Sequence, residues 1–164
     1  MICPACGATN IEGAEICAQC GRDLGGLDLL DDDSPAFIRE PLAALSGRPA
    51  ATVGVADPVG LAVRRMQDAD TSCILVHDGD RLAGILTSWD ILHKVAGPNE
   101  DLNAVPCRQV MTADPVLLNA DDSVALAINR MAVGAFRHVP VADGGEYRML
   151  DVSDVFRFIS PHLV

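Results

Sequence analysis

The stretch that decides the fold is DPVGLAVRRM at residues 57–66, because it returns as DSVALAINRM at residues 122–131. The match continues with a shift of 65 residues and then of 64, so that Asp90 falls on Asp154. The lost residue falls in an Asp-Gly turn between two apolar runs, where a length change leaves a core undisturbed. The sequence therefore contains two copies of one unit of roughly 50 to 60 residues.

Each copy predicts secondary structure in the order β-α-β-β-α. Apolar side chains recur at helical spacing after the helix-start residues Asp57-Pro58 and Asp121-Asp122-Ser123, which predicts an amphipathic helix in each copy. Short apolar runs on either side of the turn predict strands. The expected strands are 51–55, 73–76 and 82–86, then 116–120, 138–141 and 147–150, and the closing helices are 88–95 and 153–159. The fold class is α/β.

Composition bounds the class of protein. The chain has 164 residues, 49% apolar and 21% charged, which is room for one ordinary domain with a small appendage. A formal charge of −11 repels phosphate backbones and disfavours a nucleic-acid partner. No apolar run has the length of a bilayer span, and Met1–Pro4 opens without the features of a signal peptide. We expect a cytoplasmic protein with no membrane segment.

Composition also divides the chain. Residues 1–22 hold four of the six cysteines, and residues 23–37 form an acidic, glycine-containing linker. The alternative for this linker is that its leucines dock onto another part of the chain. The two copies then occupy residues 38–102 and 103–164.

Three phrases of the repeat carry a family resemblance: GILTSWD at 84–90, VMTADP at 110–115 and RHVPVAD at 137–143. Together with the element order, they resemble a tandem pair of cystathionine β-synthase (CBS) domains over about residues 38–159. The resemblance implies one pseudo-twofold module with two clefts between the copies. It also implies an adenosine-containing ligand such as AMP, ADP, ATP or S-adenosylmethionine.

The resemblance assigns ligand-binding roles in the first copy to Thr87 and Asp90, with Ile85 in the same phrase. A carboxylate at this strand-to-helix junction can accept hydrogen bonds from the ribose hydroxyls, and a hydroxyl with helix amides can meet a phosphate. The residues alone leave an alternative open. Thr87 can be an N-cap and Asp90 a first-turn acid stabilised by the helix dipole, without any ligand.

The second copy departs from the pattern because Asp151 stands where the first copy has Thr87. A carboxylate at that position repels a phosphate. The cleft with Asp151 and Asp154 is therefore expected to be the weaker of the two, and one competent site is expected per chain.

Arg137 and His138 open the middle strand of the second copy. The module resembles the gamma subunit of the AMP-activated protein kinase, in which a His-Arg pair at this place reaches nucleotide phosphates. The resemblance thus implies a site shared by Thr87, Asp90, Arg137 and His138. The alternative is that Arg137 is a solvated surface charge and His138 a half-buried ring.

The amino-terminal segment has the phrases CPACG at 3–7 and CAQCG at 17–21, and it resembles a short zinc ribbon. Each Cys-x-x-Cys turn lets two thiolates chelate one metal, and four thiolates satisfy tetrahedral zinc. With so few apolar residues the segment needs a metal in order to fold. Redox pairs or disulfides are disfavoured alternatives in a cytoplasmic chain. The expected ligands are Cys3, Cys6, Cys17 and Cys20.

The remaining candidates have structural interpretations. Cys73 and Cys107 are expected in the core, and Trp89 either stacks on an adenine or packs on the closing helix. Apolar helix faces predict a homodimer. We expect these faces to include Leu61, Val63, Ile91, Leu92, Leu126, Ile128 and Phe156.

The sequence therefore favours a regulatory protein that binds an AMP- or ADP-type nucleotide, with a zinc ribbon that contacts a partner protein. The alternative function is a ligand-free dimeric scaffold with a structural zinc. An enzyme is disfavoured, because the sequence offers no nucleophile–base pair, no open metal site and no phosphate-binding glycine loop.

Overall fold

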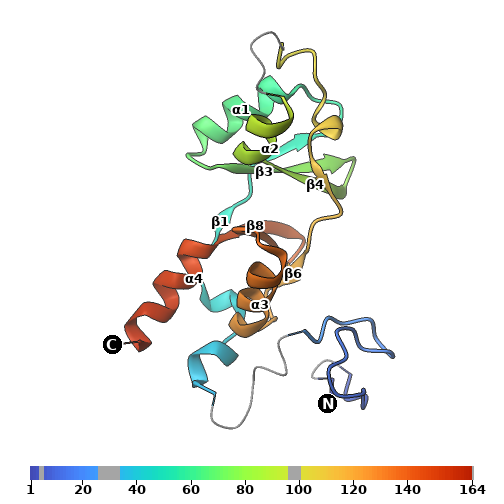
Figure 1. Cartoon of the computed structure of the whole chain (residues 1–164), viewed down its shortest axis with the longest axis vertical. Coiled ribbons are helices and arrows are strands. Elements are labelled where there is room, and N and C mark those ends of the chain that lie inside the picture. Colours follow the sequence, from blue (N-terminus) through green and yellow to red (C-terminus); the bar gives the residue numbers. More distant parts are fainter. Residues whose placement is uncertain (4–5, 26–33, 96–100, 164) are drawn as a thin grey trace. The chain divides into compact units, whose positions relative to one another are not determined.

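The computed structural model describes residues 1–3, 6–25, 34–95 and 101–163, and their contacts group into two compact units (Figure 1). One unit consists of residues 48–117 with 147–149, and contains the first repeat. The other consists of residues 1–47, 118–146 and 150–164, and contains the amino-terminal segment with most of the second repeat.

The first repeat is a four-stranded sheet with two helices. Its elements are β2 (Thr52–Gly54), α1 (Val59–Asp68), β3 (Cys73–Asp78), β4 (Arg81–Thr87), α2 (Ser88–Lys94) and β5 (Thr112–Ala113). The strand order is β2-β3-β4-β5, with β2 parallel to β3 and the other pairs antiparallel. Helices α1 and α2 lie on one face of this sheet (Figure 1). The core between them is aliphatic and includes Val59, Ile74, Val76 and Leu86, all fully buried.

The second repeat follows the same plan. Its elements are β6 (Leu118–Asn119), α3 (Val124–Gly134), β7 (His138–Asp143), β8 (Glu146–Asp151) and α4 (Val152–Ile159). The strand order is β1-β8-β7-β6, in which β1 (Arg48–Pro49) runs antiparallel to β8. The core again consists of aliphatic side chains, among them Leu118, Val124, Val139 and Leu150.

The predicted β-α-β-β-α order is confirmed in both repeats. The structure adds the two-residue edge strands β1 and β5, which were not predicted because a strand this short shows no alternation of apolar and polar residues. The expected strands 51–55 and 116–120 are shorter in the structure, as β2 and β6. Helix α4 begins at Val152, one residue earlier than expected, because Asp151 serves as its N-cap.

The helix starts differ between the repeats. Ser123 caps α3 by accepting a hydrogen bond from the Leu126 amide at 3.2 Å. Pro58 precedes α1 and provides no side-chain cap. The acids expected to begin these helices instead bond back to the preceding strand: Asp57 accepts from the Gly54 amide at 2.8 Å and Asp122 from the Asn119 amide at 2.7 Å.

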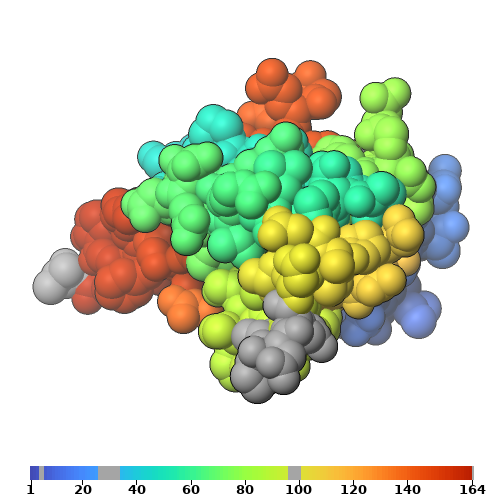
Figure 2. Space-filling view, turned by 90° about the horizontal axis from the view of Figure 1, so that it is seen from above, coloured from blue at the N-terminus to red at the C-terminus, as the bar shows by residue number. Residues whose placement is uncertain are grey.

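Short 3₁₀ turns flank the elements of the two repeats. Before the first repeat come η2 (Ala36–Arg39) and η3 (Leu42–Ala44), between the repeats lies η4 (Cys107–Gln109), and after α4 follows η5 (Ser160–His162). Residues 101–110 pack beside α1, where Val59 donates to the Val105 carbonyl at 2.8 Å (Figure 2). No helix among the described residues has both the length and the apolar composition of a membrane span.

The predicted linker, residues 23–37, lies in part outside the described residues. Of its leucines only Leu24 is described, and it is fully buried beside Cys3 and Cys17. For this residue the docking alternative is therefore correct. Leu27, Leu29 and Leu30 lie outside the described residues.

Candidate functional site

The four amino-terminal cysteines form one cluster in which all Sγ atoms lie within 4.8 Å of one another. The Sγ atoms of Cys3 and Cys20 are 3.7 Å apart, and those of Cys6 and Cys17 are also 3.7 Å apart. A zinc ion held at about 2.3 Å by four tetrahedral thiolates puts the sulfurs about 3.8 Å apart. The cluster therefore fits a four-coordinate metal with no open position.

Two matching turns position these thiols. The Gly7 amide donates to the Cys3 carbonyl at 2.9 Å, and the Gly21 amide donates to the Cys17 carbonyl at 2.9 Å. Both glycines have a φ of 71°, a left-handed conformation that favours glycine over residues with a side chain. The two Cys-x-x-Cys-Gly phrases thus form the same turn twice and aim two thiols each at a common point.

Asn10 supports this cluster from a largely buried position. Its side chain accepts from the Ala18 amide at 2.9 Å and approaches the Cys17 sulfur at 3.5 Å with Nδ2. Hydrogen bonds from the Cys20 backbone lower the pKa of the Cys17 thiol to about 6. At Cys6 the Ala8 backbone also lowers the pKa, but hydrogen bonding with the Cys20 thiol and burial outweigh it and raise the pKa to about 12. Of these two thiols, Cys17 therefore forms a thiolate more readily.

Thr87 and Asp90 form a complete capping box at the β4–α2 junction. Asp90 Oδ2 accepts from the Thr87 amide at 3.0 Å and from Thr87 Oγ1 at 2.6 Å, and the Asp90 amide donates back to Oγ1 at 3.2 Å. Asp90 is only 7% exposed. The helix-capping interpretation of these residues is therefore realised, and it accounts for one of the two carboxylate oxygens.

The second carboxylate oxygen has a partner that the sequence analysis did not find. Lys94 Nζ donates to Asp90 Oδ1 at 2.7 Å and to the Val110 carbonyl at 2.8 Å, and Thr112 Oγ1 donates to the same Oδ1 at 3.3 Å. Burial raises the pKa of Asp90, but the hydrogen bonds from Lys94 and Thr87 outweigh it and hold the pKa below its usual value. This ion pair could have been predicted from the sequence, because Asp90 and Lys94 are spaced i,i+4 on a helix.

The second repeat has the corresponding box with different chemistry. Asp151 replaces the threonine, and Asp154 Oδ2 accepts from the Asp151 amide at 3.0 Å. The other oxygen of Asp154 accepts from Arg157 at 3.0 Å, but the Arg157 side chain is 70% exposed. The two repeats thus share the geometry of the capping box, but in the second repeat the cation beside it, Arg157, is exposed to solvent.

His138 belongs to a polar pair inside the second repeat. Its Nε2 lies 3.0 Å from an Asp151 oxygen, and its side chain is 15% exposed. Burial lowers the pKa of His138, while the charge of Asp151 acts in the opposite direction. For His138 the half-buried ring of the alternative interpretation is what the structure contains. Arg137 adjoins it, and its carbonyl accepts from the Val152 amide at 2.9 Å.

The other candidates have mainly structural surroundings. Ile85 and Cys73 are both buried in one apolar cluster, and Cys107 is fully buried, which raises the pKa of its thiol to about 11. Trp89 is 67% exposed, and its ring lies against His93 one turn further along α2, with centroids 3.5 Å apart. Packing on the closing helix is therefore the arrangement observed for Trp89.

A groove of about 630 Å³ lies on the first repeat between α1 and α2. The residues that line it include Val63, Met66, Ile91, Leu92 and Ser72. Neither Thr87 nor Asp90 lines it. The groove is thus a feature of the helical face and not of the capping box.

The comparisons with known proteins identify the class. The model of the CBS domain matches residues 42–97 and 107–160, so the chain belongs to the CBS domain family as a tandem pair. The CBS domain-containing protein CBSCBSPB3 of Arabidopsis thaliana is 33% identical over 93 residues, which are 57% of this chain and 17% of that protein. The chain thus corresponds to less than a fifth of this plant relative.

Solved structures share the fold. A protein with CBS domains from Burkholderia ambifaria is 30% identical, with a TM-score of 0.64 over 72% of this chain and 89% of that one. A CBS domain protein from Pyrobaculum aerophilum, solved in complex with AMP, has a TM-score of 0.61 over 70% of this chain and 89% of its own. At 19% identity, the second likeness establishes the fold alone.

Proposed function

We propose that the chain is a regulatory protein that binds one adenosine nucleotide of the AMP or ADP type, through Thr87 and Asp90 of the first repeat. The observation that carries the proposal is the capping box at the β4–α2 junction, where a largely buried carboxylate stands beside a lysine. The AMP complex of the Pyrobaculum relative supports the same ligand class.

The hydrogen bonds of Asp90 define how a nucleotide would be held. Oδ2 stays in the capping box, and the ribose hydroxyls replace the lysine and Thr112 donors on Oδ1. The Lys94 side chain is 45% exposed, so it can turn from Asp90 toward a phosphate. A lysine beside the ribose acid thus favours a phosphorylated nucleoside over free adenosine.

The second repeat is proposed to contribute no comparable ribose site. Asp151 takes the place of the threonine, and the hydrogen bond to Ser153 and the pairing with His138 occupy its oxygens. The predicted phosphate contacts of Arg137 and His138 stay a prediction, and Arg137→Ala tests them through the affinity for AMP. One nucleotide per chain is the expected stoichiometry.

Thermal shift against AMP, ADP, ATP, adenosine and S-adenosylmethionine tests the proposal. A ligand at about 100 times its dissociation constant stabilises the folded state by about 2.7 kcal/mol. Asp90→Asn should reduce the shift strongly, because an amide cannot accept both ribose hydrogen bonds as a carboxylate does. Asp154→Asn is the matched control at the other capping box, and it should keep the shift. Absence of a shift with every adenine compound would favour the ligand-free scaffold.

We further propose that the cysteine cluster is a zinc ribbon that contacts a partner protein. Four thiolates at tetrahedral spacing are the ligand set of structural zinc, which contributes folding energy and no chemistry of its own here. Ile2, Ile11 and Ile16 are 69%, 81% and 62% exposed. Three exposed isoleucines on so small a segment are typical of a protein-binding surface.

We also propose that the chain is not an enzyme, resides in the cytoplasm and forms a homodimer. Leu92 on α2 and Phe156 on α4 are 63% and 64% exposed, which supports an interface on the helical faces. Two of the residues expected on these faces are buried and cannot contribute to an interface. Ile91 and Leu126 are 9% and 5% exposed, because each packs into the core of its own repeat.

A further inference from the structure

We infer that the amino-terminal ribbon is a metal-dependent clamp on the second CBS repeat, acting through Arg22 and the buried Asp122. The inference rests on the proposed metal site. In this arrangement the metal holds the ribbon in the fold that places Arg22, and Arg22 in turn pairs with the buried carboxylate of Asp122. Metal occupancy and the order of the β6–α3 turn are then coupled.

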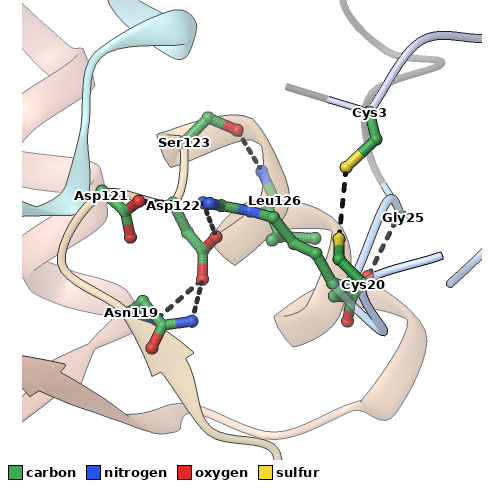
Figure 3. A network of polar contacts seen from close by, with 10 residues as sticks. Cys3, Cys20, Gly25, Asn119, Asp121, Asp122, Ser123 and Leu126 are labelled. Carbon is green, nitrogen blue, oxygen red and sulfur yellow. Dashed lines mark hydrogen bonds and ion pairs between the residues drawn. The ribbon is translucent and has the colours of Figure 1, made fainter. Parts of the chain in front are cut away.

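The contact consists of one arginine and two neighbouring acids. Arg22 Nη2 donates to Asp122 Oδ1 at 2.6 Å, and Nη1 donates to Asp121 Oδ2 at 3.1 Å. Asp122 is 4% exposed, whereas the Asp121 side chain is 72% exposed. Figure 3 shows Asp122 at the turn before α3, with dashed lines for its hydrogen bonds to Asn119. Of the two bonds, the one to Asp122 carries the energetic weight, because an exposed ion pair contributes little.

The first repeat provides an internal comparison. Asp57 occupies the position equivalent to Asp122 and makes the equivalent bond to the preceding strand, to the Gly54 amide at 2.8 Å. In the described part of the chain Asp57 has no basic partner, and it is only half-buried. The structural role of the acid therefore does not need an arginine. The arginine is specific to the repeat that the ribbon covers.

The metal cluster and Arg22 are joined by a short path. The Cys17 amide donates to the Arg22 carbonyl at 2.8 Å, so a metal ligand fixes the arginine backbone directly. Two residues later, Leu24 is fully buried in the small apolar cluster of Cys3 and Cys17. The segment thus has one side chain in the ribbon core and Arg22 on the second repeat. Without the metal the ribbon does not fold, so neither Leu24 nor Arg22 is held in place.

A second ion pair of opposite polarity ties the same segment to α3. Arg130 of α3 donates to Asp23, which also accepts from the Gly25 amide at 2.8 Å. The Arg130 side chain is 17% exposed and that of Asp23 is 33% exposed, so this pair is partly shielded from solvent. Two pairs with opposite charge order favour this register of the segment, since an exchange of the two partners would bring like charges together.

The coupling predicts reciprocal effects on metal affinity and on amide exchange. Zinc affinity is measured by competition with a chromophoric chelator in the full chain, on wild type, Arg22→Ala, Asp122→Asn and the double variant. We expect each single variant to lose about tenfold in zinc affinity, and the double variant to lose no more than either single variant. Asp57→Asn is the matched control, and it should leave the zinc affinity unchanged.

Amide exchange reads the coupling from the other side. On removal of zinc with a chelator, the Asn119 amide, which is bonded to Asp122, should exchange about tenfold faster. The Gly54 amide, bonded to Asp57, should keep its rate. The clamp is refuted, and the zinc proposal stands, if Arg22→Ala keeps the wild-type zinc affinity and the Asn119 amide exchanges at the same rate with and without the chelator. If elemental analysis finds no zinc in the wild type, the zinc proposal fails, and the clamp with it.

Discussion

Lys94→Met tests whether the lysine beside the candidate nucleotide site stabilises the first repeat. The substitution keeps an unbranched apolar stem and deletes the charge that lies 2.7 Å from Asp90 Oδ1. A hydrogen bond to a charged group contributes about 1.5 to 3 kcal/mol. Because the Lys94 side chain is 45% exposed, we reduce this to about 1 to 2 kcal/mol at pH 7. For a unit as small as the first repeat, the melting temperature should fall by about 4 to 8 °C for each kcal/mol of lost stability.

The loss should depend on pH with a definite sign. The folded pKa of Asp90 lies below its usual value, so its contribution is complete above the unfolded pKa of about 4 and disappears as pH falls through the folded pKa. Once Asp90 is protonated, the lysine has no charge to pair with. The difference between wild type and Lys94→Met should therefore shrink in acid.

Urea unfolding, followed by circular dichroism from neutral to acidic pH, measures this difference. Arg157→Met is the matched control, because Arg157 pairs with Asp154 of the second repeat at 3.0 Å but has a side chain that is 70% exposed. It should cost less than about 0.5 kcal/mol. The reasoning is refuted if Lys94→Met costs no more than Arg157→Met, or if its cost is the same in acid.

Three further outcomes are expected. Protein purified without chelator should hold about one zinc per chain by elemental analysis, as four thiolates bind one ion, and Cys17→Ser should lose it. Burial lowers the folded pKa of His138 below about 6.5, so the free energy of unfolding should fall as pH drops below that value. In Asp151→Asn, NMR titration should show a still lower pKa for His138, since the Asp151 charge raises this pKa. Light scattering should give twice the chain mass of 17.3 kDa, and Leu92→Lys should give the monomer.

Most of the fold could be predicted from the sequence, because the repeat aligns the same apolar pattern twice. Helices α1 to α4 and the central strands have long enough runs for periodicity to define them. The edge strands β1 and β5 could not be predicted. Each is two residues long, and pairing partners such as Met149 for Arg48 are distant in sequence.

The candidate sites were predictable to different degrees. The cysteine cluster follows from local spacing alone, since two identical turns carry all four thiols. The Asp90–Lys94 pair was accessible through its i,i+4 spacing. The ion pair of Arg22 with Asp122 was not, because it joins residues 100 positions apart and no periodicity relates them. The burial of Ile91 and Leu126 also depends on which helix face meets the sheet, which single-sequence patterns leave uncertain by a residue or two.

Titration calorimetry of the wild-type chain with AMP tests the central claim most directly, because it reports affinity and stoichiometry together. The account predicts one AMP per chain, with a dissociation constant below about 1 mM, corresponding to a binding free energy beyond about −4.1 kcal/mol. Asp90→Ala should weaken this binding about 10- to 150-fold, a loss of about 1.5 to 3 kcal/mol, while Asp154→Ala changes it less than about threefold. Absence of binding, or binding lost in Asp154→Ala and kept in Asp90→Ala, would contradict the account.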